Sequence, residues 1–365
     1  MPVALRSRSL LGLLAGLLAA GCASPRAAAL HALESGDTSV ALAELEPLAE
    51  HGDAPAQFLL GLLHDGGCGD PDDDALAAHW YGRAAAQGNA AAQNNLGLLC
   101  FEGRGVERSL EEASRWYQRA ADQGFAPALT NLGVMLHFGL GLENDERRAR
   151  ALFLHAGRQG DAKAQCILGS LYEEGTGLSA DPVEAARWYR RAAEQGLALA
   201  QYHLGLMYVT GRGVPASDRL AVSWLERAAE QGLDEGQFAL GWMIREGRGV
   251  ARDDAAAAGW FWRAAEGGLA SAQAALGLMH VQGRGVEKDD ARGADWLRRA
   301  AEQGLALAQY DLGLLYAKGL GVPRDPELAT QWLQRAADQG LAAAREKLDL
   351  IQVMGPGVQE NDSGA

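Results

Sequence analysis

The eight histidines are the first residues to test for chemistry, because imidazole serves as a metal ligand and as a general base. They are His31, His51, His64, His79, His137, His155, His203 and His280. No two of them have the close spacing, such as His-Glu-x-x-His, that puts two ligands on one helical face. The sequence also contains no Gly-x-Ser-x-Gly nucleophile motif. We therefore predict no catalytic residue, no metal site and no cofactor.

The four Gly-Arg-Gly-Val turns, which begin at Gly103, Gly211, Gly247 and Gly283, superficially suggest phosphate-binding loops. A phosphate loop follows a strand, whereas these turns follow helical segments and recur at a fixed interval. We interpret them as helix terminators. The net charge of −14 repels phosphate backbones, so we expect no nucleic-acid partner.

The first cysteine, Cys22, follows a leader in which Arg6 and Arg8 precede an apolar run at residues 10–18. That run is too short to span a bilayer and has the order of a secretory signal. The small residues before Cys22 resemble the bacterial lipobox, in which the cysteine is lipidated and becomes the mature N-terminus. We predict a signal peptide at 1–21, a tether at 22–29 and a lipid anchor at Cys22; an ordinary signal peptide is the alternative. The resemblance, with Ala23 in place of Asp, implies the outer membrane, facing the periplasm.

The other cysteines, Cys68, Cys100 and Cys166, form no regular pattern. Cys68 lies in a turn and Cys100 lies near the end of the following helix, so the two could meet across neighbouring repeats. A Cys68–Cys100 disulfide is compatible with an oxidising compartment. Buried free thiols are an equally good interpretation.

Most of these residues lie within a strict 36-residue repeat, which sets the helices that position them. Leu-Gly recurs at Leu60, Leu96, Leu132, Leu168, Leu204, Leu240, Leu276 and Leu312. A fixed period of this length is typical of a solenoid. We predict an all-α, α/α superhelical solenoid of eight helix–turn–helix repeats over residues 53–340.

Within a repeat, helix A is expected at about Ala198–Thr210 and helix B at about Asp218–Gln231. Asp181-Pro182-Val183-Glu184 has the residue types of a helix N-terminus, with Asp as the N-cap, Pro at N1 and Glu at N3. Alanine occupies one column of helix B in every repeat. A tryptophan column beside it, Trp80, Trp116, Trp188, Trp224, Trp260, Trp296 and Trp332, is expected to fill the core next to these alanines.

The two ends depart from the pattern. Residues 30–52 lack the Leu-Gly and Gly-x-Gly signals and are expected to form a degenerate helical hairpin that caps the stack. Residues 341–353 are expected to form a C-terminal capping helix. The tail at 354–365 has no apolar period and is expected to be disordered.

Gln165–Gly196 contains, in order, Leu-Gly-x-x-Tyr, Gly-x-Gly and Ala-x-x-Trp-Tyr-x-Arg-Ala-Ala-Glu-Gln-Gly. This pattern resembles the Sel1-like repeat. The resemblance implies a right-handed superhelix related to tetratricopeptide repeats, and a role as an adaptor or assembly scaffold.

Comparing the repeats with one another separates constant from variable positions in helix A. The variable positions, those equivalent to Leu199, Tyr202, His203, Leu206, Val209 and Thr210, fall on one helical face. We predict that this face lines a concave groove and binds a partner. Its polar and aromatic members are Asn94, Asn95, Thr130, Asn131, Tyr202, His203, Phe238, Trp242, Arg245, Tyr310 and Asp311. Alternatively, the variation marks unconstrained solvent-facing positions.

Three functions remain open. The first is a non-enzymatic, lipid-anchored scaffold of the cell envelope, monomeric by itself, that binds an envelope protein. The second is an assembly factor of an exopolysaccharide secretion complex, by resemblance to a repeat lipoprotein of alginate export. The third is β-lactam binding or hydrolysis, as implied by cysteine-rich Sel1-like proteins, whose regular disulfides this chain lacks.

Overall fold

The computed structural model describes residues 25–66, 71–176 and 179–354, and within them every regular element is an α-helix. The predicted signal peptide, Cys22, Cys68 and the tail from residue 355 lie outside the described residues. Two compact units divide the chain, the first ending at Ser179 and the second beginning at Ala180. None of the described helices is long and apolar enough to cross a membrane.

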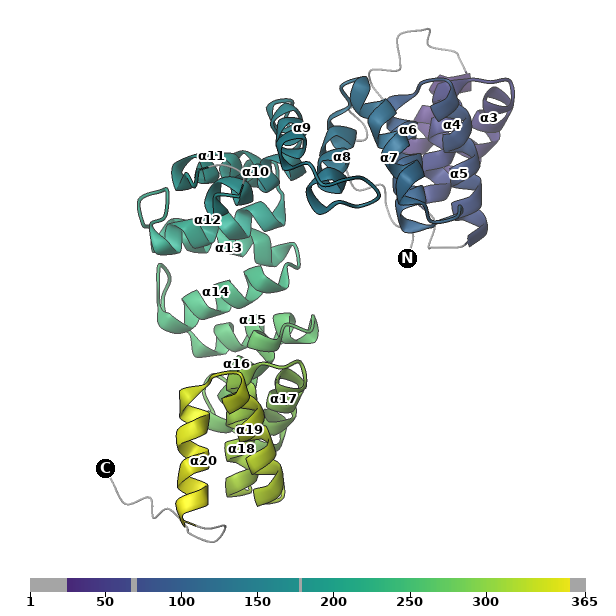
Figure 1. The fold of residues 1–365 in the computed structure, drawn as a ribbon. Coiled ribbons are helices and arrows are strands. Elements are labelled where there is room, and N and C mark those ends of the chain that lie inside the picture. The colour runs from purple at the N-terminus through teal and green to yellow at the C-terminus, as the bar shows by residue number, and fades with distance from the viewer. Residues whose placement is uncertain (1–24, 67–70, 177–178, 355–365) are drawn as a thin grey trace. The chain divides into compact units, whose positions relative to one another are not determined.

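The first unit begins with a hairpin of two helices and continues with alternating A and B helices (Figure 1). Its elements are α2 (Pro25–Ser35), α3 (Thr38–Glu50), α4 (Ala54–Asp65), α5 (Pro71–Ala86), α6 (Ala90–Glu102), α7 (Leu110–Asp122), α8 (Ala126–Phe138), α9 (Glu146–Arg158) and α10 (Ala162–Glu174). From α4 onward, even-numbered helices up to α18 are A helices and odd-numbered ones are B helices.

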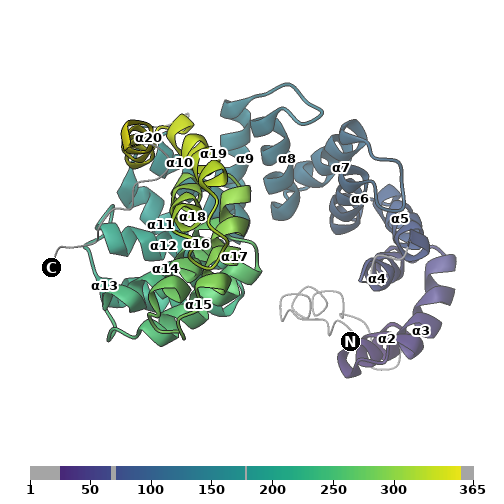
Figure 2. The same ribbon diagram turned by 90° about the horizontal axis from the view of Figure 1, so that it is seen from below.

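The second unit repeats the same alternation and ends with a single helix. Its elements are α11 (Pro182–Glu194), α12 (Ala198–Thr210), α13 (Asp218–Glu230), α14 (Asp234–Glu246), α15 (Asp254–Glu266), α16 (Ala270–Gln282), α17 (Asp290–Glu302), α18 (Ala306–Lys318), α19 (Pro326–Asp338) and α20 (Ala342–Met354). Within each unit, helices consecutive in sequence pack side by side (Figures 1 and 2). The prediction of an all-α solenoid built from 36-residue repeats is confirmed.

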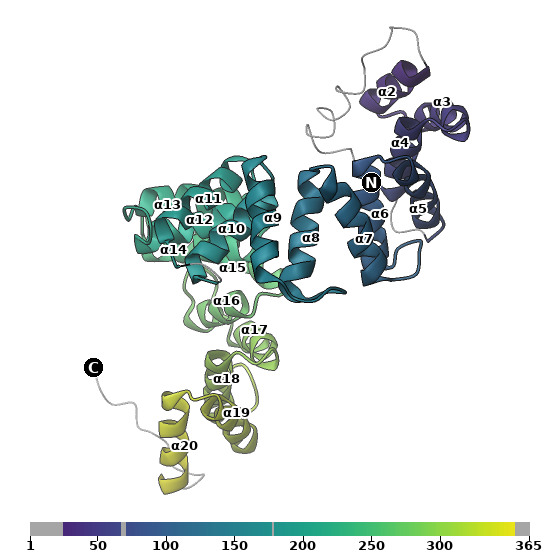
Figure 3. The same ribbon diagram turned by 45° about the horizontal axis from the view of Figure 1, so that its top comes forward.

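Both ends of the described chain are helical. The hairpin of α2 and α3 packs onto α4, and α20 packs against α19 (Figure 3). The predicted tether is wrong from residue 25 onward, because α2 already begins at Pro25. Proline fits the first turn of a helix, and the alanines that follow have the highest helix propensity, so this stretch continues as helix.

The turns have the predicted caps. The Asp181 side chain accepts hydrogen bonds from the backbone N–H groups of Val183 and Glu184 at the start of α11. Gly211 ends α12 in the left-handed conformation, with φ of 71°, which only glycine adopts without strain. Gly213 has φ of 72°, and a Cβ there would overlap the carbonyl oxygen of Pro182. The second glycine therefore lets the turn contact the preceding helix B.

The core column of helix B differs from the predicted one. The side chain that packs against the glycine of Leu-Gly is the residue after the tryptophan, such as Tyr81 against Gly61 and Phe261 against Gly241. Tyr81 and Phe261 are fully buried. Of the tryptophans in the predicted column, only Trp188 is buried, and the others are partly exposed.

An arginine three residues later covers each of these tryptophan rings. In α13, for example, the Arg227 guanidinium lies 4.6 Å from the centroid of the Trp224 ring. The pairs are Trp80–Arg83, Trp116–Arg119, Trp188–Arg191, Trp224–Arg227, Trp260–Arg263, Trp296–Arg299 and Trp332–Arg335. One turn of helix places the arginine over the ring, where a cation–π contact forms.

Candidate protein-interaction surface

The turn after helix A is tied to the preceding repeat by its arginine. In the second unit, Arg248 Nε donates to Asp218 Oδ2 at 3.1 Å and Arg248 Nη2 donates to Oδ1 at 2.5 Å. Asp218 is the first residue of α13, in the preceding repeat. Such a two-pronged contact is the strong form of an arginine–carboxylate pair. Arg248 is thus held against the preceding repeat by an ion pair.

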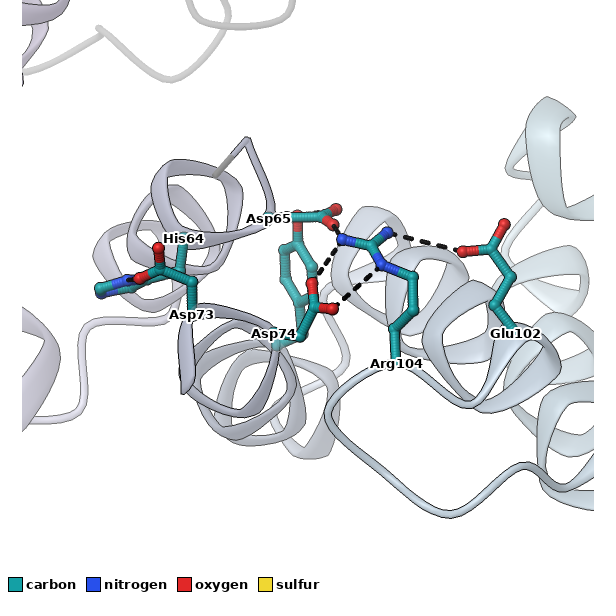
Figure 4. Close-up of polar contacts among 7 residues, drawn as sticks. His64, Asp65, Asp73, Asp74, Glu102 and Arg104 are labelled. Carbon is teal, nitrogen blue, oxygen red and sulfur yellow. Dashed lines mark hydrogen bonds and ion pairs between the residues drawn. The ribbon is translucent and has the colours of Figure 1, made fainter. Parts of the chain in front are cut away.

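The first unit contains the equivalent arginine–aspartate contact within a larger cluster of charged residues. Arg104 donates to both oxygens of Asp74, at 3.3 and 2.5 Å, and to Asp65 at 2.9 Å. Figure 4 shows the Arg104 side chain between these two aspartates on one side and Glu102 on the other. The Tyr81 hydroxyl donates to the same Asp65 at 3.1 Å. The cluster joins the first repeat to the second.

A buried glutamine in helix A makes two hydrogen bonds, one to the preceding repeat and one within its own repeat. Gln201 Nε2 donates to the carbonyl oxygen of Ala193 at 3.1 Å, and Gln201 Oε1 accepts from Gln231 Nε2 at 2.7 Å. The equivalent glutamines that also receive this bond are Gln57, Gln93, Gln273 and Gln309. All of them are buried. Each adds a side-chain hydrogen bond to a carbonyl group at the end of the preceding helix B, where Ala193 O, for example, also accepts from the Gly196 amide.

One connection of this kind is incomplete. Gln237 Nε2 donates to Ala229 O at 3.3 Å, but Gln237 Oε1 is buried without a hydrogen-bond partner. The residue that would donate to it is Gly267, which has no side chain to do so. A buried acceptor without a donor lowers stability.

In the first unit, the candidate partner-binding amides bind one another. Asn131 Nδ2 donates to Asn94 Oδ1 at 3.0 Å, and Asn94 Nδ2 donates to Asn95 Oδ1 at 3.1 Å. The Asn95 side chain is in turn hydrogen-bonded to the hydroxyl of Tyr81. Asn94 is buried. This chain of amides leads from α8 to the Arg104 cluster and leaves few polar groups open to a partner.

Thr130, the fourth candidate of the first unit, is also engaged internally. It is buried, and its hydroxyl lies 3.1 Å from Ala126 O and 2.9 Å from Asp161 Oδ1. Asp161 is the N-cap of α10 and accepts from the Ala164 amide. Thr130 therefore supports the start of the next helix A.

In the second unit, the candidates are aromatic and partly exposed. The His203 ring stacks on the Tyr189 ring, with centroids 4.9 Å apart and planes 7° from parallel. Tyr202 meets His203 edge to face at 5.3 Å. Burial raises the pKa of Tyr202. These rings are held in fixed orientations by their neighbours and are still open to solvent on one side.

The next repeat of the second unit continues this aromatic surface. The ring of Phe238 lies 5.4 Å from that of Phe261, and the Arg245 guanidinium lies 5.8 Å from the same Phe261 centroid. Arg248 lies 5.4 Å from the centroid of the Trp242 ring. The arginine that fixes the turn thus also positions Trp242.

The last repeat brings the final two candidates. Tyr310 packs against the cluster that contains Leu333 and Ala344. Asp311 is partly buried and makes no hydrogen bond or ion pair within the part of the chain that the structure describes. Burial raises the pKa of Asp311 to about 6, with no contribution from a charged neighbour. Asp311 is therefore a desolvated carboxyl group on this surface.

The described residues contain neither a cluster of metal ligands nor an exposed free thiol. No group of three or more His, Cys, Asp or Glu residues within the described ranges could hold a metal ion. The thiols of Cys100 and Cys166 are free and buried, and burial raises the pKa of both, to about 12 for Cys166. A thiol with a raised pKa is a poor nucleophile at neutral pH.

Sequence reasoning did not identify Arg104, Arg248 and the buried glutamines as inter-repeat contacts. The signal was present, because a polar residue that recurs in one column of a buried helix face must have a recurring partner. The partner lies in another column, thirty residues later for Gln201 and Gln231. Gln201 and Gln231 lie in the same repeat, but the sequence pattern does not show that these two columns bind each other.

The family model described as Sel1 repeat matches eight consecutive segments: residues 54–89, 90–125, 126–161, 162–197, 198–233, 234–269, 270–305 and 306–341. A Sel1 repeat protein from Oxalobacter formigenes is 33% identical, with a TM-score of 0.60 over 91% of this chain and 95% of that one. A protective antigen of uropathogenic Escherichia coli is 31% identical, with a TM-score of 0.47 over 87% and 84%. Among curated proteins, none matches the chain.

Proposed function

Since the chain belongs to the Sel1 repeat family, we propose that it is a non-catalytic scaffold that binds another protein through the A helices of its second unit. Proteins with this repeat generally mediate protein–protein interaction. The observation that carries the proposal is the aromatic surface of Tyr202, His203, Phe238 and Trp242, which is partly exposed on a frame whose constant positions are buried. Tyrosine, tryptophan and arginine are the usual anchors of protein interfaces.

The proposal includes a membrane location. Lipidation of Cys22 would hold the repeats at the surface of a bacterial membrane, with an envelope protein as the partner. The order of Arg6, Arg8, the apolar run and the small residues before Cys22 supports this part.

The partner is tested by crosslinking in intact bacterial cells that express the full chain. A variant with Tyr202, His203, Phe238 and Trp242 changed to Ala is compared with a control that carries Val183→Ala, Leu220→Ala and Trp262→Ala. The control residues are exposed apolar side chains of B helices in the same unit. We expect one envelope protein to be crosslinked to the wild type and to the control, but not to the first variant.

Circular dichroism must show that both variants remain folded. If the partner is retained by the first variant and lost from the control, the binding surface lies on the B helices and the proposal is wrong. Loss from neither variant also contradicts it.

The anchor is tested separately with a clickable palmitate label. Cys22→Ser is expected to abolish labelling and to release the protein from the membrane fraction, whereas Cys166→Ser is expected to change neither. Labelling that persists in Cys22→Ser would refute the lipid anchor but leave the binding proposal intact.

A further inference from the structure

Polar residues in the Asp311 column of the A helices find partners at two fixed distances along the chain. Asn131 donates to Asn94, thirty-seven residues earlier, on the preceding helix A. Asn95 is hydrogen-bonded to Tyr81, fourteen residues earlier, on the preceding helix B. His203 stacks on Tyr189 at the same fourteen-residue distance. A polar side chain in this column is therefore satisfied by a neighbouring repeat.

The same two distances lead from Asp311 to Ala274 and Leu297. Both side chains are aliphatic and buried, and both belong to one apolar cluster together with Leu312. Neither can donate a hydrogen bond or carry a charge. This is why the Asp311 carboxyl group has no partner within the described residues, and why burial alone raises its pKa.

The residues one helical turn from Asp311 on α18, and the residue in the Asp311 column on α16, are apolar. Leu314 and Tyr310 lie on the same helix, α18, and Leu278 lies on α16, where Ala274 and Ala275 are the small residues of the stack. All of these side chains except Ala274 are partly exposed. An ionised carboxylate in such a place has lost water without gaining a protein partner, which costs stability.

We propose that Asp311 is the anchor for a Lys or Arg side chain on the bound segment of the partner protein, with apolar residues beside that side chain packing on Tyr310, Leu314 and Leu278. This inference rests on the proposed function and specifies the chemistry of the partner. A cationic side chain of the partner would neutralise the Asp311 carboxylate, and the attraction is stronger because Asp311 is partly shielded from water. The net charge of −14 favours a basic segment and disfavours a second copy of this chain.

The test selects random peptides, displayed on phage, on the immobilised full chain. Peptides that are recovered are synthesised, together with versions in which each Arg or Lys is replaced by Gln. Their affinities are measured by fluorescence anisotropy against the wild type, Asp311→Asn and Asp295→Asn. Asp295 is the matched control, because it is an exposed aspartate of α17 that pairs with Arg298.

We expect recovered peptides to contain one essential basic residue. Its replacement by Gln and the Asp311→Asn substitution should each weaken binding by about tenfold or more. The two changes together should weaken binding little more than either change alone. Asp295→Asn should have no such coupling to the peptide.

Two other outcomes overturn the inference in different ways. Peptides that bind Asp311→Asn as tightly as the wild type, but lose binding to the variant with Phe238 and Trp242 changed to Ala, contradict the role of Asp311 and leave the proposed function standing. Recovery of no peptide that binds the wild type contradicts both.

Discussion

The A helices of the two units have the same constant positions, but the side chains at their variable positions make different contacts. In the first unit, Asn94, Asn95 and Asn131 satisfy one another and connect to Tyr81. In the second unit, the same columns hold Tyr202, Phe238 and Tyr310, beside an Asp311 that has no partner in the described residues. Variation between repeats therefore has two origins. A variable residue either completes a contact with the next repeat or remains available to another molecule.

The largest expected effect is on partner binding. Phe238→Ala together with Trp242→Ala should weaken binding by about 1,000-fold, because aromatic anchors at interfaces contribute about 2 kcal/mol each. Asn131→Ala in the first unit should change affinity by less than about threefold. The partner that crosslinking identifies is purified and titrated with each purified variant, which gives the affinity of each. Equal losses of affinity for the two variants would mean that the two units do not differ in this way.

The next effect is on the pH dependence of stability. The pKa of Asp311 is about 6 in the folded chain and 3.8 as its ordinary value, so the ionised form destabilises the fold. Asp311→Asn should therefore raise the free energy of unfolding at about pH 7.5, by up to about 3 kcal/mol.

The gain from Asp311→Asn should shrink as the pH falls through about 6 and vanish below 3.8, where the carboxyl group is protonated in both states. Urea unfolding across this range gives the difference directly. Asp295→Asn should show no gain. A wild type that is as stable as Asp311→Asn at every pH would mean that Asp311 has a partner after all.

A somewhat smaller effect is expected in the first unit. Asn94→Ala removes the acceptor of Asn131 and the donor to Asn95, and should cost about 1–3 kcal/mol of unfolding free energy, because buried polar groups lose their partners. Asn94→Ala should leave peptide or partner affinity unchanged. Loss of affinity without loss of stability would instead make the amide chain a binding site.

The smallest expected effect is on the stability that the buried glutamine hydrogen bonds contribute. Gly267→Gln with Asp234→Ala should supply the missing donor to Gln237 Oε1 and add about 1 kcal/mol. The second change is needed because a Cβ at residue 267 would overlap the Asp234 carboxylate. The matched variant Gln231→Gly, which removes an existing donor to Gln201, should lose a similar amount. Chemical denaturation compares the two.

Much of the fold was predictable because its signals are local. The predicted helix A at Ala198–Thr210 coincides with α12, since Gly211 at its end requires a left-handed backbone. The predicted tryptophan column is buried only at Trp188, because in the other repeats the tryptophan packs at the edge of the core and the next residue, such as Tyr81 after Trp80, contacts the glycine. Which of two neighbouring aromatic residues faces the glycine, as Tyr81 faces Gly61, depends on the rotation of helix B, and that rotation is set by packing.

The candidate surface was predictable only as a set of columns. Asn94 and Tyr202 occupy the same column, and nothing in one repeat shows that the first is buried in hydrogen bonds while the second is partly exposed. The difference is decided by residues one repeat away. The isolation of Asp311 likewise follows from Ala274 and Leu297, which look ordinary in their own repeats.

The glutamine contacts between successive repeats also determine how the chain opens. Because each one couples only nearest neighbours, cooperativity passes from repeat to repeat, and a weak coupling divides the array into blocks that exchange independently. The unfilled acceptor at Gln237 weakens a different contact, the one that joins the start of α14 to the end of α15 inside one repeat. Among the interior helices of the second unit, amide hydrogen exchange should therefore be fastest where α14 meets α15. This contact lies next to the aromatic surface that is proposed to bind the partner.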